Sequence, residues 1–294
     1  MSQPAAPLAC PPAATDLLDV GHGPDVVVLL HSSMASKSQW RALTERLRGT
    51  HRLLAVDLYG YGAAPSPAGL PDFCLADEAS RVRRLIDERL PAGARVHLVG
   101  HSYGAAVALR LAIALGDRVR RLVLFEPTAF HAVPAADAHR LGEVRHVAAL
   151  LDEGASPRGT AVARFIDFWN GERSFESLTR ERRDALRAVA PKVRLDFKAL
   201  FDPRCRAADY RRIDVPVLLL GGDHSPACTR AVLASLAQVL PRGELQMLPC
   251  GHMGPVTHAG LVNERIATFL GAPSPCEPTG APVAARRPLA AVPA

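Results

Sequence analysis

The chain has 294 residues, of which 48% are hydrophobic and only 5% aromatic, so it can bury the core of one large domain or two small ones. The longest apolar runs, such as 26–30 and 215–220, are far shorter than the roughly 20 residues that span a bilayer, which argues against a membrane span. The net charge of +6 comes mostly from arginines interleaved with Asp and Glu, a pattern that favours a solvated surface over a nucleic-acid partner.

Residues 1–14 are rich in Pro and Ala and have neither a basic flank nor an apolar core, so they indicate a disordered tail rather than a signal peptide. The six cysteines are scattered singly, and none forms a pair at metal-ligand spacing. This usage predicts free thiols in a reducing compartment and no metal site. We therefore expect a cytoplasmic protein.

The first half of the chain alternates short apolar strands with amphipathic helices. Strands are expected at 15–20, 25–30, 51–56, 95–99 and 119–125, and helices at 38–47, 75–90 and directly after residue 104. Continuous apolar runs such as 25–30 are typical of strands that are buried on both faces of a parallel sheet. The alternation predicts an α/β fold whose parallel strands are joined by right-handed crossovers.

The turn Gly100-His101-Ser102-Tyr103-Gly104 lies between an expected strand and an Ala-rich helix. A strand that reverses into a helix within one turn forces its central residue into a strained conformation, and small residues two positions on either side relieve the crowding. Ser102 would then project from the end of the sheet, beside a helix N-terminus that favours negative charge. The pattern predicts a serine nucleophile.

Residues 131–210 contain no convincing strand. Helices are expected near 137–151, 158–170, 178–189 and 193–201. Aromatic residues are concentrated here: Phe165, Phe168, Trp169, Phe175, Phe197 and Phe201. These rings either pack within the segment or line an apolar pocket, and the sequence does not sort them.

The α/β alternation resumes after this segment, with strands at 215–220 and 243–248 and helices at 226–240 and 261–270. Residues 272–294 are a low-complexity stretch of Pro, Ala and Arg, which predicts a second disordered tail.

On these features the sequence resembles the α/β-hydrolase superfamily. Residues 100–104 match its G-x-S-x-G nucleophile elbow, and the turn Asp57-Leu58-Tyr59-Gly60-Tyr61-Gly62 resembles its glycine-rich loop beside the active site. The resemblance implies a mostly parallel sheet of about eight strands flanked by helices. It also implies a discontinuous core, 15–130 and 211–271, with 131–210 as a helical cap.

The resemblance further implies a triad in the chain order Ser, acid, His. Ser102 is its nucleophile, and His252 matches the family's histidine because it lies in a Gly-His-Met-Gly-Pro loop after the last strand. Two acids remain open. Glu126 directly follows the strand after the elbow, as the acid does in haloalkane-dehalogenase-like members, and is preferred. Asp223 follows the strand that usually carries the acid. The family spacing places the acid at position 224, where this chain has His224, so Asp223 lies one position early.

An oxyanion hole needs two backbone N–H donors. By the resemblance, one is Tyr103, the residue after the nucleophile. The other is Ser33, in a His31-Ser32-Ser33 sequence where the family usually has His-Gly-x, so that Ser32 replaces the glycine.

These residues predict a cofactor-independent serine hydrolase, esterase-like, that cleaves an ester, thioester or related acyl bond of a small apolar substrate through an acyl-enzyme. The alternatives are C–C bond hydrolysis or acyl transfer by the same triad, and a non-catalytic ligand-binding member of the fold. Dehalogenase and epoxide-hydrolase chemistry is disfavoured because those members have Asp in the place of Ser102. No cofactor or metal is expected, and the oligomeric state stays open.

Overall fold

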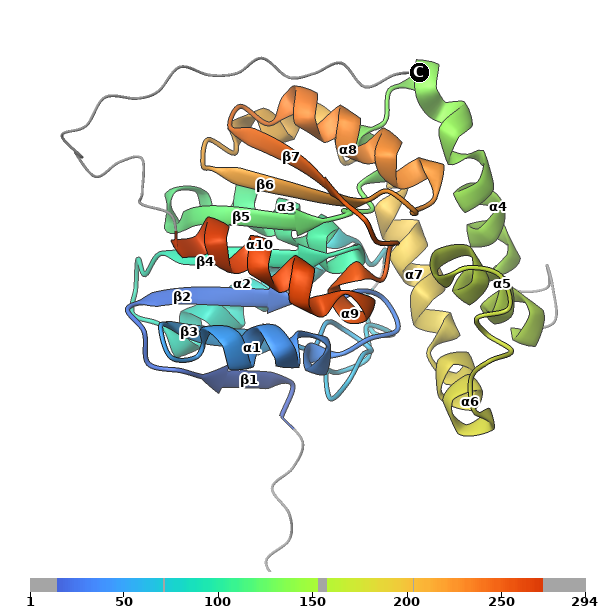
Figure 1. Cartoon of the computed structure of the whole chain (residues 1–294), viewed down its shortest axis with the longest axis horizontal. Helices are drawn as coiled ribbons and strands as arrows, with labels where there is room; N and C mark the ends of the chain where they lie inside the picture. The colour runs from blue at the N-terminus through green and yellow to red at the C-terminus, as the bar shows by residue number, and fades with distance from the viewer. Residues whose placement is uncertain (1–14, 71, 153–157, 203, 272–294) are drawn as a thin grey trace, which may run out of the picture.

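The computed structural model describes residues 15–70, 72–152, 158–202 and 204–271 (Figure 1). The two tails expected at 1–14 and 272–294 lie outside the described residues. Within the described residues, no helix is long and apolar enough to cross a membrane.

A seven-stranded sheet runs through the middle of the molecule, with the strand order β1-β3-β2-β4-β5-β6-β7. Its strands are β1 (Leu17–Val20), β2 (Asp25–Leu30), β3 (His51–Val56), β4 (Val96–His101), β5 (Val119–Phe125), β6 (Val217–Gly222) and β7 (Gly243–Leu248). Only the edge strand β1 is antiparallel, to β3, and the other neighbours pair in parallel. The chain order reverses between β2 and β4, so the elbow after β4 lies at the centre of the sheet.

The sheet has fewer strands than the eight or so that the family resemblance implies. In the described part of the chain before β2 there is one strand, β1, and it closes the edge of the sheet against β3. The seven strands lie where the apolar runs predict them. The difference in strand number therefore comes from the family resemblance and not from the pattern of apolar residues.

Helices cover both faces of the sheet, and each face has its own apolar core (Figure 1). On one face lie α1 (Arg41–Leu47) and α10 (Ala259–Gly271), preceded by the short α9 (Gly254–Thr257). On the other lie α2 (Leu75–Arg89), α3 (Tyr103–Leu115) and α8 (Ala227–Val239). The continuous apolar strands follow from this arrangement, since successive side chains enter opposite cores.

Between β5 and β6 the described residues form helices and turns but no strand: α4 (Gly142–Leu150), α5 (Arg158–Asn170), α6 (Arg180–Ala188) and α7 (Ala190–Leu200). We call residues 131–210 the helical insertion. Figure 1 shows these helices beside one end of the sheet, where α7 lies closest to the strands.

Three helices of the insertion differ from expectation at their start. The helix expected from 137 is a 3-10 helix over Ala135–Leu141, and the α-helix α4 begins only at Gly142. The helix expected from 178 begins at Arg180, because the Thr179 hydroxyl caps it by accepting a hydrogen bond from the Arg182 N–H at 3.3 Å. The helix expected from 193 already begins at Ala190, since Pro191 is tolerated in a first turn.

Candidate active site

Ser102 lies in the elbow between β4, which ends at His101, and α3, which begins at Tyr103. Its backbone has φ 54° and ψ −118°, a conformation that non-glycine residues rarely adopt and that costs on the order of 1–3 kcal/mol. The Ser102 N–H donates to the Phe125 carbonyl at 2.9 Å, which ties the turn to the neighbouring strand β5. The serine therefore stands at the end of the sheet in a fixed orientation.

The two glycines of the elbow are required by space. A Cβ at Gly100 would lie 2.5 Å from the Cα of Ala105, and a Cβ at Gly104 would lie 2.4 Å from the His31 carbonyl oxygen. Both neighbours are backbone atoms that cannot move aside. The packing thus requires glycine on either side of the serine, as the sequence argument for small residues expects.

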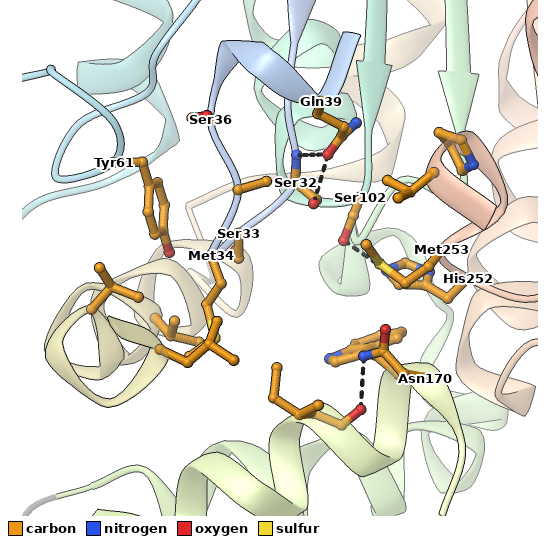
Figure 2. A pocket seen from close by; sticks show the side chains of 18 of the residues that line it. Ser32, Ser33, Met34, Ser36, Gln39, Tyr61, Ser102, Asn170, His252 and Met253 are labelled. Atoms are coloured by element: carbon orange, nitrogen blue, oxygen red, sulfur yellow. Dashed lines mark hydrogen bonds between the residues drawn. The ribbon is translucent and has the colours of Figure 1, made fainter. Parts of the chain in front are cut away.

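Ser102, His252 and Glu126 form a continuous hydrogen-bonded chain. The Ser102 Oγ is 2.9 Å from His252 Nε2 (Figure 2). His252 Nδ1 is 2.6 Å from Glu126 Oε2. An ionised carboxylate only accepts, so Nδ1 carries the proton and Nε2 is left to accept from the serine hydroxyl. All three side chains are buried. The arrangement can take a proton from Ser102.

Glu126 is held in place from its other side as well. It follows β5 with φ 42°, and its Oε1 accepts a hydrogen bond from the Gly222 N–H at 2.7 Å. A buried carboxylate is costly unless its oxygens have donors, and here each oxygen has one. This second contact fixes the carboxylate relative to β6.

Asp223, the alternative acid, is exposed. It follows β6, and its backbone N–H donates to the Leu248 carbonyl at 2.9 Å. Of the two acids that the sequence leaves open, the structure therefore brings Glu126 against His252.

The His252 ring contacts two other rings. The Trp169 ring of α5 lies with its centroid 4.1 Å away at an interplanar angle of 32°, and the His101 ring lies 5.1 Å away. His101 donates from Nε2 to the His252 carbonyl at 2.8 Å. Burial holds the pKa of His101 well below its usual value, so this histidine is neutral. His101 and Trp169 restrain both the backbone and the ring of His252.

The loop after β2, which carries Ser33, is fixed by two neighbours of that residue. The Ser32 N–H and hydroxyl both donate to Gln39 Oε1, at 3.1 and 2.9 Å (Figure 2). His31 donates from Nδ1 to the Ser32 carbonyl at 2.7 Å and accepts from the Leu58 N–H at 3.0 Å. Burial lowers the pKa of His31 to about 4, so it stays neutral in this role. Gln39 holds the loop where Ser32 replaces the family's glycine.

A cavity of about 870 Å³ opens above Ser102 and His252, which are both among its lining residues. Its apolar wall comes largely from the helical insertion: Phe165, Ile166, Trp169, Leu186, Val189, Val193, Phe197 and Leu200. Exposed residues that line it include Ser38, Arg41, Ser177 and Arg182. The cavity thus has an apolar interior and a polar margin, the usual make-up of a small-molecule site. Among the described residues, no group of three or more His, Cys, Asp or Glu side chains could hold a metal ion.

Sequence reasoning missed several residues that shape this site, namely Gln39, Trp169, Lys192 and Asp196. Trp169 belongs to the aromatic set of 165–201, but nothing in that set marks it as the ring that meets His252. The sequence does contain a signal for Lys192 and Asp196. They are a pair of opposite charges at i and i+4 on a helix, next to the apolar face that carries Val193 and Phe197. Gln39 has none.

Comparison with known proteins places the chain in one family. The model of the alpha/beta hydrolase family matches residues 27–265. The chain is 29% identical to the pimeloyl-[acyl-carrier protein] methyl ester esterase of Nitrosomonas europaea over 82% of this chain and 93% of that protein. It is 26% identical to a 2-hydroxymuconate semialdehyde hydrolase of Pseudomonas sp. over 87% of this chain and 90% of that protein. An esterase from Exiguobacterium antarcticum has the same fold, with a TM-score of 0.69 at 18% identity, over 88% of this chain and 98% of that one.

The chain belongs to the alpha/beta hydrolase family, and the fold class expected from the sequence is confirmed. It is a hydrolase, as its named relatives are.

Proposed function

We propose that this hydrolase is a cofactor-independent serine hydrolase that cleaves an ester, thioester or related acyl bond of a small apolar substrate. The observation that carries the proposal is the contact chain from Ser102 through His252 to Glu126. A serine hydroxyl is a weak nucleophile by itself, and a neutral imidazole held by a carboxylate removes that limit.

In the reaction that we propose, Ser102 Oγ attacks the substrate carbonyl carbon while its proton passes to His252 Nε2. The tetrahedral intermediate collapses when His252 returns the proton to the departing alcohol or thiol, which leaves an acyl-enzyme. Water, activated by the same histidine, then releases the acid. Glu126 keeps the proton of His252 on Nδ1 and stabilises the imidazolium that forms in each step.

We assign the oxyanion hole to the backbone N–H groups of Ser33 and Tyr103. Tyr103 is the first residue of α3, so its N–H has no acceptor within the helix and is free for a developing negative charge. Ser33 and Ser102 both line the cavity. Two donors fixed before the reaction begins need no reorganisation when the charge forms.

We also propose that the helical insertion, residues 131–210, is a cap over a core made of 15–130 and 211–271. Its support is the cavity, whose apolar wall comes mainly from α5, α6 and α7. An apolar wall favours an apolar acyl or alcohol group in the substrate. The named activity of the Nitrosomonas relative, a methyl ester esterase, also favours an ester.

A second candidate is C–C bond hydrolysis, or acyl transfer, by the same three residues. It is favoured by the likeness to the Pseudomonas hydrolase, which is named for a semialdehyde substrate and not for an ester. A non-catalytic binding protein is a third candidate, which the intact contact chain disfavours.

We place the protein in the cytoplasm as part of this proposal. Its support is that Cys74, Cys205, Cys228 and Cys250 are free thiols, as expected in a reducing compartment. Cys10 and Cys276 lie outside the described residues.

The test is hydrolysis of p-nitrophenyl acetate, butyrate and hexanoate by the wild type and by Ser102→Ala. We expect the substitution to lower kcat at least about 10⁴-fold, because it removes the nucleophile. The matched control is Ser235→Ala, which removes the hydroxyl of a buried serine on α8. Esterase function is wrong if the wild type leaves all three esters intact, or if Ser102→Ala hydrolyses them as fast as the wild type.

A further inference from the structure

A buried cluster of charges joins the helical insertion to the core directly beside the candidate active site. Lys192 and Asp196 of α7 form an ion pair one turn apart on the same face of the helix. The Lys192 Nζ also lies 3.2 Å from Glu78 Oε1 of α2. The side chains of Lys192, Asp196 and Glu78 are only 5%, 1% and 0% exposed. One ammonium thus bridges two buried carboxylates from different parts of the chain.

Three hydroxyl groups and one backbone N–H donate to the two carboxylates at their remaining positions. Asp196 Oδ2 accepts from the Ser33 hydroxyl at 2.6 Å and from the Tyr61 hydroxyl. Glu78 Oε1 accepts from the Tyr103 hydroxyl at 3.1 Å, and its Oε2 accepts from the Tyr59 N–H at 3.2 Å. Burial raises the pKa of Glu78, and the Lys192 ammonium opposes that shift. The cluster is a closed network in which every carboxylate oxygen has a donor.

Aromatic rings enclose the ammonium on its other sides. Lys192 Nζ lies 4.6 Å from the ring centroid of Tyr103, 4.8 Å from that of Tyr61 and 4.9 Å from that of Phe73. Cations are attracted to the faces of such rings, most strongly where water is excluded. The position of Lys192 is therefore fixed by charge and by packing together.

Two members of this network, Ser33 and Tyr103, are the residues whose N–H groups we assign to the oxyanion hole. Each is tethered through its side chain to a carboxylate, and both carboxylates contact the same Lys192. The residue after Ser33, Met34, has φ 58°, which is strained for a side chain of this kind. A strained loop keeps its shape only where neighbouring contacts hold it.

We propose that Lys192, Asp196 and Glu78 are positioning residues that hold the N–H groups of Ser33 and Tyr103 in place for the oxyanion. Helix α7 of the insertion would thus take part in setting the oxyanion hole as well as in forming the pocket wall. The proposal rests on the serine hydrolase function proposed above.

A role in stability alone does not account for this arrangement. A buried ion pair contributes little net stability compared with well-packed apolar residues of the same volume. The carboxylates of Asp196 and Glu78 instead accept hydrogen bonds from the hydroxyl groups of two residues near Ser102. These are Ser33, in the loop after β2, and Tyr103, the first residue of α3. Donors that stabilise charge act mainly in the transition state, so loosening them lowers kcat more than it raises KM.

The kinetic test uses Ser33→Ala and Tyr103→Phe, which cut the tethers but keep both backbone N–H groups. We expect each to lower kcat for p-nitrophenyl butyrate about tenfold with KM within about twofold, less than the loss of a whole donor. Affinity for phenylboronic acid, which mimics the tetrahedral intermediate, should fall by a similar factor. The matched controls are Ser235→Ala and Tyr210→Phe, which remove hydroxyl groups of a buried serine and a buried tyrosine outside the charge cluster. The Tyr210 hydroxyl contacts His131.

Asp196→Asn supplies a readout that does not depend on activity. The substitution keeps the side-chain volume but removes the charge, so amide hydrogen exchange in peptides covering 31–36 and 100–105 should be faster than in the wild type. Tyr210→Phe should leave the same peptides unchanged. The positioning role is overturned if kcat in both tether variants stays within twofold of the wild type, or if exchange in Asp196→Asn is unchanged. Failure of wild-type ester hydrolysis would instead overturn the proposed function, and the exchange result would then decide the positioning role alone.

Discussion

Backbone strain gathers around one serine. Of the five non-glycine residues with positive φ in the described part of the chain, Ser102 and Glu126 belong to the contact chain and Met34 to the adjacent loop. Such conformations cost on the order of 1–3 kcal/mol each and persist where surrounding contacts determine them. At Ser102 the elbow glycines leave room for the tight turn, and at Glu126 the Gly222 N–H holds the carboxylate by a hydrogen bond. The local strain is stored where side-chain direction matters most.

The choice of acid can be tested by two matched substitutions that each remove one carboxylate charge. We expect Glu126→Gln to lower kcat for p-nitrophenyl acetate by about 10³ to 10⁴, because an amide can donate to Nδ1 and hold the wrong tautomer. Asp223→Asn should leave kcat within about twofold, since that side chain is exposed. Steady-state kinetics of both variants check this. The reverse pattern would make Asp223 the acid, and two unaffected variants would rule out both.

The two acids also show which features of single residues can be predicted from the sequence and which cannot. Ser102 and His252 are predictable because short motifs mark them, and the elbow glycines follow from local sterics alone. The partner of His252 depends on which carboxylate points inward after its strand. Glu126 and His252 are joined through the fold and not through any local pattern, so the residues could only leave the choice open.

At the scale of elements, the pattern of apolar residues predicts nearly every strand and helix, since each needs only local periodicity. It does not predict what an amphipathic helix faces. Asp196 reaches Ser33, and Trp169 reaches His252, across contacts between segments far apart in the chain. For this reason the sequence indicates a helical segment over the site but not which of its side chains complete the site.

The pocket wall that α5 supplies gives a prediction on substrate length. Ile166 is half-buried and lines the cavity, so Ile166→Trp should fill part of it. We expect kcat/KM for p-nitrophenyl hexanoate to fall at least about tenfold more than for the acetate, because the longer acyl chain needs the space.

The matched control for this substitution is Ile113→Trp, at a half-buried isoleucine of α3 that is not among the residues lining the cavity. It should change the ratio of the two kcat/KM values by less than about twofold. Equal losses for both esters in Ile166→Trp would mean that the acyl chain binds elsewhere.

At the scale of the whole molecule, two apolar cores hold the sheet between them, and several histidines are buried in neutral form. Burial lowers the pKa of His97 on β4 to about 4, and that of His31 likewise. Unfolding restores an ordinary pKa of about 6.5. Below pH 6.5 the unfolded chain therefore binds protons that the folded protein excludes, and the free energy of unfolding falls as the pH falls towards 4.

Each such histidine can contribute about 1.4 kcal/mol per pH unit in this window. We expect urea denaturation to give a lower free energy of unfolding at pH 5 than at pH 7. In His97→Gln the difference between these two free energies should be about 2 kcal/mol smaller than in the wild type. His22→Gln, at an exposed histidine, is the control and should keep the wild-type pH dependence. Identical pH dependence in the wild type and His97→Gln would contradict this explanation.

The central claim is that Ser102 is a nucleophile activated by His252, and covalent labelling tests it most directly. The folded wild type is incubated with a fluorophosphonate probe, and the modified residue is identified by peptide mass spectrometry. We predict a single adduct on Ser102, its absence from Ser102→Ala, and labelling at least about 10²-fold slower in His252→Ala. No adduct on the wild type, while a known serine hydrolase in the same mixture is labelled, would contradict the claim, as would an adduct on any other residue.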